Sequence, residues 1–146
     1  MKHTLKLYKI TEFDNEGGFI IYVECKINHK KANLIVDTGA TRTIINLDSC
    51  KKLMISSKNE NGDNIRIETK GIGSNNLTSV PITIDEITFN RLHIKNADAF
   101  ATDLSDIVDV LKDKAHIDGI MGSDILNQYS SVIDYGKCVI RFVNET

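Results

Sequence analysis

Apolar and polar residues alternate along most of this chain, which is the pattern of β-strands that bury one face in a sheet. The alternation is clearest after the turn signal Gly17-Gly18, where β-branched and aromatic residues continue to Ile27. The pattern predicts strands over residues 4–10, 19–27, 31–36, 44–45, 64–68, 77–84, 87–100, 131–134 and 138–143. The polar turn at 28–30 is short enough to join its two strands as a hairpin.

Three short segments have helical periodicity instead. Four apolar residues between positions 104 and 111 repeat at helical spacing and predict an amphipathic helix over residues 103–114. Asn46 is a suitable N-cap for a short helix that continues to Leu53, and residues 123–127 form the third. Residues 56–63 are polar and predict a loop. We expect an all-β fold with two or three short helices, in a single domain over residues 1–146.

Length and charge exclude several classes of function. A chain of 146 residues can hold one core of its own. Its net charge of −2 and its lack of a basic stretch argue against nucleic acid as the main partner. No apolar segment approaches the length of a membrane span, so we expect no membrane partner. The first ten residues lack the continuous apolar core of a signal peptide, which favours a cytoplasmic protein.

The cysteines and histidines give no sign of a metal site or of thiol chemistry. Cys25, Cys50 and Cys138 are an odd number without the CxxC spacing, which fits reduced and mostly buried thiols. The four histidines stand far apart, without the spacing of zinc ligands. We therefore expect no metal and no cofactor.

The candidate chemistry is concentrated in the run Asp37-Thr38-Gly39-Ala40. The run follows apolar residues 34–36 and precedes more apolar strand at 44–45. A carboxylate in such a setting is costly unless it is hydrogen-bonded or used in chemistry. Gly39 would permit a tight backbone bend, and Thr38 could hold the loop through its hydroxyl. An Asp-Thr-Gly triplet also occurs by chance, and taken alone it is more often a turn than a catalytic site.

This run occurs only once in the chain. Two carboxyls that share one proton provide an acid and a base that can activate a water against an amide. One copy of the run cannot do this alone. A twofold homodimer would bring Asp37 of one chain against Asp37 of the other, because the same patch of both subunits meets at such an interface.

Two glycine-containing segments accompany the acid. The run Gly71-Ile72-Gly73 is the tip of a predicted long hairpin, and it lacks the third glycine of a dinucleotide fingerprint. Residues 119–123 loosely match a phosphate-binding loop but lack its Gly-Lys-Ser/Thr ending. Both segments are therefore better explained by the architecture around Asp37 than by nucleotide binding.

Taken together, these segments resemble a known family. The runs LIVDTGATRTII (34–45), GIG (71–73) and IDGIMGSDIL (117–126) follow the order found in retropepsin-like aspartic proteases, the single-domain dimeric relatives of pepsin. The resemblance covers residues 19–142 and fits the non-viral type. It implies a closed β-barrel-like acid protease fold with one lobe per chain, active as a homodimer. The helix predicted within 102–114 departs from viral members, as does Ser123, where those carry arginine.

The resemblance also implies roles for single residues. Asp37 resembles the catalytic aspartate, Thr38 the threonine that joins the two active-site loops across the dimer, and Gly39 the turn glycine. The residues implied to contact substrate are Ala40, the flap residues Gly71, Ile72, Gly73 and Ser74, and Ile120 and Gly122 beside the catalytic loop. The implied activity is that of an aspartic endopeptidase on a peptide or protein substrate. The alternative is a non-catalytic dimer of the same fold that binds a peptide or a partner protein.

Overall fold

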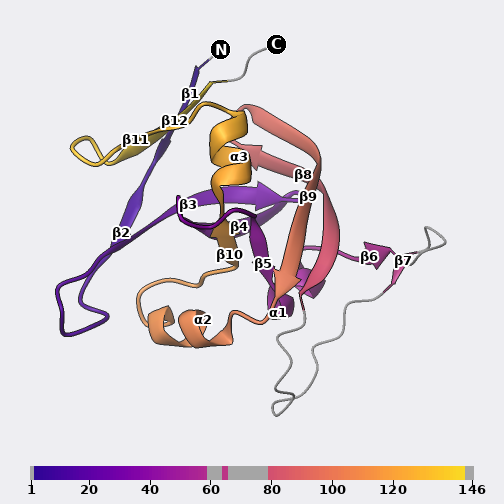
Figure 1. Cartoon of the computed structure of the whole chain (residues 1–146), viewed down its shortest axis with the longest axis horizontal. Helices are drawn as coiled ribbons and strands as arrows, with labels where there is room; N and C mark the ends of the chain where they lie inside the picture. The colour runs from indigo at the N-terminus through magenta and orange to yellow at the C-terminus, as the bar shows by residue number, and fades with distance from the viewer. Residues whose placement is uncertain (1, 59–63, 66–78, 144–146) are drawn as a thin grey trace.

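The computed structural model describes residues 2–58, 64–65 and 79–143, and its centre is a closed barrel (Figure 1). In the order of hydrogen-bonded neighbours, the barrel strands are β3 (Ile20–Ile27), β4 (Lys30–Val36), β10 (Gly119–Met121), β5 (Ile44–Asn46), β9 (Leu92–Thr102) and β8 (Val80–Phe89). Lys26 pairs with Thr88 and Ile27 with Ile87, which joins β8 back to β3 and closes the barrel. The expected all-β class and closed barrel are confirmed.

Smaller sheets flank the barrel. β12 (Val139–Val143) lies between β1 (Lys2–Lys6) and β11 (Val132–Asp134), so the first and last described strands are neighbours (Figure 1). β2 (Tyr8–Ile10) extends the barrel sheet beyond β3, and β6 (Ser57–Lys58) pairs with β7 (Asn64–Ile65). The rings of Phe89 and Phe142 are both fully buried, with centroids 5.0 Å apart. The terminal sheet therefore shares the core of the barrel.

The three helices of the described residues are short: α1 (Leu47–Lys52), α2 (Ser105–Leu111) and α3 (Ser123–Gln128). α2 is shorter than the predicted 103–114, and it packs its apolar side against the outer face of β4 and β10 through Ile107, Val108 and Leu111. The predicted helix is thus a packing element that covers the strands leading to Asp37. No helix in the described ranges has the length and apolarity to cross a membrane.

The predicted hairpin at residues 28–30 is confirmed by the pairing of β3 with β4. Asn28 and His29 have φ values of +49° and +68°. Two consecutive left-handed residues match the right-handed twist of the strands they join, and asparagine adopts this conformation readily. The Asn28 side chain also donates to the carbonyl of Leu53 at 2.9 Å, which ties the turn to the end of α1.

Three strand boundaries differ from prediction. The predicted strand 87–100 is strand at both ends but not continuous, because the chain turns back at Asn90-Arg91 between β8 and β9, with Asn90 at φ +53°. β8 instead runs without a break through the polar pair Asp85-Glu86. The predicted strand 4–10 divides at Leu7, whose N–H leaves β1 to bond Cys138. The predicted loop 56–63 contains β6 at its start.

Glu86 stands at the seam where β8 meets β3. Its backbone accepts from Asn28 N at 2.8 Å and donates to the Asn28 side chain at 3.1 Å. The Glu86 carboxylate accepts from the ammonium of Lys95, and the imidazole of His93 lies 3.4 Å away. The Lys95 hydrogen bond, followed by those of His93 and Thr88, lowers the pKa of Glu86 from 4.5 to about 2.

This lowered pKa predicts a pH-dependent contribution to stability. Because the folded state holds Glu86 ionised, its contribution is present above pH 4.5 and is lost as the pH falls toward 2. Glu86→Gln should therefore lower the melting temperature at neutral pH, and the deficit should shrink in acid. This pH dependence can be checked with melting curves between pH 2 and neutral pH. The proteins compared are wild type, Glu86→Gln and the loop control Glu16→Gln. A deficit of the same size at every pH would contradict the argument.

The thiols that the structure describes are free. Burial raises the pKa of Cys50 to about 11, and it raises the pKa of Cys25 further above its usual range. A thiol held protonated at neutral pH is a poor nucleophile. Both residues therefore act as core side chains, in agreement with the prediction that they are reduced and buried.

Candidate active site

The candidate catalytic loop begins where β4 ends. The Asp37 N–H donates to the Met121 carbonyl of β10 at 3.1 Å, and the Ala40 N–H donates back to the Asp37 carbonyl at 3.2 Å. Gly39 N donates to Asp37 Oδ1 at 2.9 Å, which orients the carboxylate. Asp37, Thr38 and Gly39 are all exposed. The fold therefore holds the acid in a fixed turn and presents it to the outside of a single chain.

Gly39 leaves space beside the acid, and its backbone angle is not an unusual one. The chain turns at Gly39, but its φ is not in the left-handed region, so this turn does not require glycine for its backbone angle. A Cβ at this position would instead lie 3.3 Å from Asp37 Oδ1. A side chain at position 39 would crowd the carboxylate and its hydrogen bond, so glycine keeps one side of the acid open.

β10 lies beside the catalytic loop, as the sequence predicted for Ile120 and Gly122. It pairs in parallel with β4 and antiparallel with β5, so it fills the gap between the two strands that flank Asp37. Gly122 lies directly under the loop, where a Cβ would be 2.7 Å from the carbonyl oxygens of Ala40 and Arg42. Ser123 N donates to Ala40 O at 2.7 Å. The loop can approach this closely only because residue 122 has no side chain.

A second set of contacts locks the far end of the loop to α3. The Thr43 hydroxyl donates to Asp124 Oδ1 at 2.8 Å, and Thr43 N donates to Asp124 Oδ2 at 2.9 Å. The same hydroxyl accepts from Gly122 N at 3.2 Å, while Ile125 N donates to Asp124 Oδ1 at 2.8 Å. Sequence reasoning missed this pair. The sequence feature that could have indicated it is Asp124, an acid in the first turn of the helix that follows Gly122.

Thr43→Val should weaken this lock without changing the shape of the side chain. Thr43 is fully buried, so valine would leave Gly122 N without its acceptor and would remove the hydroxyl that donates to Asp124 Oδ1. We expect a loss of about 1–3 kcal/mol in the free energy of unfolding, measured by urea denaturation. Thr43→Ser keeps the hydroxyl and should lose less. A loss in Thr43→Val no larger than that in Thr43→Ser would contradict the leading role given to the hydroxyl.

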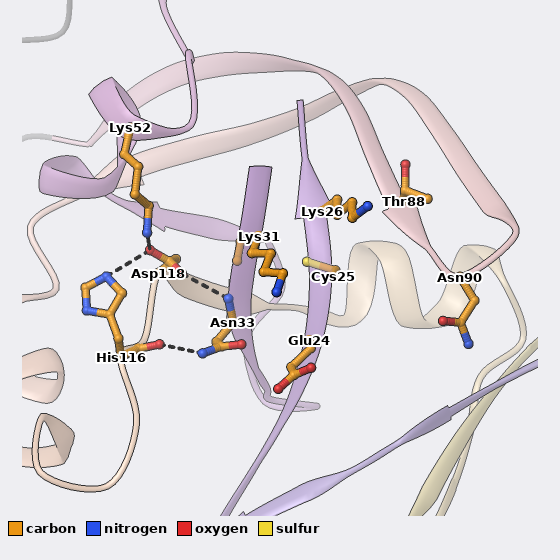
Figure 2. A pocket seen from close by; sticks show the side chains of 11 residues that line it. Glu24, Cys25, Lys26, Lys31, Asn33, Lys52, Thr88, Asn90, His116 and Asp118 are labelled. Carbon is orange, nitrogen blue, oxygen red and sulfur yellow. Dashed lines mark hydrogen bonds and ion pairs between the residues drawn. The ribbon is translucent and has the colours of Figure 1, made fainter. Parts of the chain in front are cut away.

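A buried acid anchors the other end of β10. The side chain of Asp118 is 2% exposed, and its carboxylate accepts from Asn33 N and Lys52 Nζ, each at 2.9 Å (Figure 2). It also accepts from Ser49 Oγ at 2.9 Å. His116 Nε2 lies 3.1 Å from the same carboxylate. These contacts join β4, α1 and β10 below the catalytic loop. Sequence reasoning missed Asp118, although an acid inside an apolar run is the same signal that identified Asp37.

One of the hollows in the described surface begins at Arg42, next to the catalytic loop. It has a volume of about 460 Å³ and is walled by residues of β8 and β9 together with Met54 and Ser56. Arg42 supplies a cation to this hollow, and Asp85 and Asp98 supply carboxylates. A recess with charges of both signs thus begins at Arg42, five residues after Asp37 in the sequence.

The structure brings most of the predicted site residues together. Residues 37–40 form the loop, Gly122 supports it from below, and Ile120 lies in β10, half-buried among the side chains under α2. The predicted flap residues Gly71, Ile72, Gly73 and Ser74 lie outside the described residues. A single chain therefore presents one exposed carboxylate on a loop held by β10 and α3.

This barrel is found in solved aspartic proteases. A retropepsin-like aspartic protease from Rickettsia conorii superposes with a TM-score of 0.54 at 16% identity, covering 97% of this chain and 90% of that one. The retroviral protease-like domain of Ddi1 from Leishmania major superposes with a TM-score of 0.50 at 16% identity, covering 87% and 96%. The fold is therefore that of the retropepsin-like aspartic proteases.

A comparison of the sequence alone identifies the family, independently of the fold. Residues 23–128 match the model of the family described as "gag-polyprotein putative aspartyl protease". None of the curated proteins compared with the chain matches it. The matched range is most of the chain and includes the Asp37 loop, β10 and α3. This chain belongs to that aspartyl protease family.

Proposed function

We propose that this chain is an aspartic endopeptidase that works as a homodimer, with one Asp37 from each copy at a shared site. The observation that carries the proposal is the exposure of Asp37 on a loop that is fixed on both sides. A single carboxylate cannot act as base and acid at the same time, whereas two carboxylates that share a proton supply both. The family membership supports protease chemistry at this position.

In the proposed mechanism, a water lies between the two Asp37 side chains. One carboxylate takes a proton from the water as it attacks the peptide carbonyl, while the protonated partner donates a hydrogen bond to the carbonyl oxygen. The proton then passes to the leaving amine, and no covalent intermediate forms. Thr38 joins the two loops across the twofold axis, and Gly39 leaves room beside the acid for the water.

The substrate is a peptide or protein segment in extended conformation, bound across the dimer interface like an added strand. Ala40 lines its path on one side, on the loop that Gly122 supports from below, and the predicted flap at 71–74 covers it on the other.

Digestion of a peptide library, combined with measurement of the mass in solution, tests this function. We expect cleavage across roughly pH 4 to 7, with activity per chain rising with the fraction of dimer. Cleavage by a strictly monomeric protein would reject the shared site. A dimer that cleaves no peptide would favour the alternative, in which the same groove binds a peptide or a partner protein without hydrolysis.

A further inference from the structure

A second cavity lies at the opposite end of the β4–β10 pair from Asp37. It has a volume of about 640 Å³, which is within the range of small-molecule sites. β3, β4, the end of β8, Lys52 of α1 and the segment before β10 form its walls (Figure 2). Asn33 lies on its wall, four residues before Asp37, so the two places are separated by about 13 Å along β4. The cavity is therefore distinct from the catalytic loop.

Asp118 at the wall of this cavity positions two basic side chains. Its buried carboxylate is already occupied by Asn33 N, Ser49 Oγ, Lys52 Nζ and His116 Nε2. The side chains of Lys52 and His116 are nevertheless 49% and 63% exposed. An ammonium has three donors, so Lys52 keeps free N–H groups for a ligand. Asp118 thus neutralises part of the local charge and also fixes the position of donors beside the cavity.

Lys26 and Lys31 add an uncompensated charge. They are directly opposite each other on β3 and β4, and both are exposed. Like charges in this position destabilise a sheet, because the two Cβ atoms are only about 5 Å apart. Neither lysine has an ion pair within the described part of the chain. The remaining acid of the cavity, Glu24, balances only one of the two.

We propose that this cavity binds a small organic anion that carries phosphate or carboxylate groups. One end of the cavity offers Lys52 and His116, the middle offers Lys31, and the other end offers Lys26 near Thr88 and Asn90 (Figure 2). An anion with more than one acidic group can contact several of these donors at once. Binding would relieve the repulsion between Lys26 and Lys31. The inference does not depend on peptide cleavage, since no residue of the catalytic loop lines the cavity.

Titration with pyrophosphate and with citrate, at fixed ionic strength, tests the proposal. Backbone amide NMR signals should shift at Asn33 and Asp118 and not at Asp37, and calorimetry should give the affinity. The double variant Lys26→Gln/Lys31→Gln should weaken binding by about tenfold or more. The matched double variant Lys112→Gln/Lys114→Gln removes two exposed lysines elsewhere and should bind as wild type does. Without ligand, the cavity variant should be no less stable than wild type, because it removes the repulsive pair.

Each outcome decides the proposal. Binding of pyrophosphate alone identifies a phosphate ligand, binding of citrate alone a carboxylate ligand, and binding of both a site that recognises charge. Failure of both probes to bind at millimolar concentration would overturn the proposal. Equal weakening in the two double variants would overturn it as well, since it would show attraction to the surface as a whole.

Discussion

Asp37→Asn is expected to reduce peptide cleavage by at least about a thousandfold while the fold stays intact. The proposed mechanism needs one Asp37 to accept a proton and the other to donate one, and an amide can do neither. Stability should change little, because Asp37 is exposed and its carboxylate takes one hydrogen bond in the described structure, from Gly39 N. The oxygen of an asparagine side chain can accept that bond too.

A matched control separates this loss from a change in net charge. Asp109 lies exposed on α2, and Asp109→Asn removes the same charge away from the loop. It should cleave the peptide library as wild type does. Cleavage that survives Asp37→Asn at more than a few per cent of the wild-type rate would reject the role given to Asp37.

Asp118→Ala should have the largest effect on stability, a loss of about 3 kcal/mol in the free energy of unfolding. The variant leaves Asn33 N and Ser49 Oγ without their acceptor in a buried place, and it removes the anion that holds Lys52 and His116. This loss in the free energy of unfolding should be at the lower end of the range for a broken buried ion pair. The reason is that Lys52 is half exposed, so its ammonium can return to water. Urea denaturation at neutral pH measures it.

Two companion variants identify the source of that loss. Lys52→Met should cost about 1 kcal/mol, since Asp118 keeps its bonds to Asn33, Ser49 and His116. Asp118→Asn keeps the size of the side chain and one acceptor oxygen, so its cost should fall between the other two. Equal costs for Asp118→Ala and Lys52→Met would show that the ion pair alone matters and that the buried hydrogen bonds do not.

The alternation of apolar residues predicted most of the barrel strands, whereas their closure into a barrel was implied by the resemblance to the family. Strands β3 and β4 and their turn were predicted nearly to the residue, because one face of each strand is buried and Asn28 suits a left-handed turn. The turn at Asn90 was missed for a related reason. Its flanking residues Phe89 and Leu92 are both apolar and buried, so the pattern looks continuous where the chain reverses.

The candidate site was predicted only in part. Asp37 was found because an acid at the end of an apolar run is conspicuous in the sequence, and Gly122 was found because its segment resembles one of the family. The contact between Thr43 and Asp124 joins residues 81 positions apart, and the Asp118 network joins β4 and α1 to β10. Local periodicity carries no information about such pairs. The closeness of Gly39 to the acid also became clear only in the structure, where the missing Cβ leaves space beside Asp37.

The central claim is that two copies of the chain share one active site, and mixing wild-type and Asp37→Asn subunits tests it most directly. With the wild-type amount held constant and subunits allowed to exchange, an equal amount of variant should leave about a quarter of all dimers with two Asp37 residues. The cleavage rate should then fall to about half, and further variant should lower it toward zero. A rate that does not change as Asp37→Asn subunits are added would contradict the shared site.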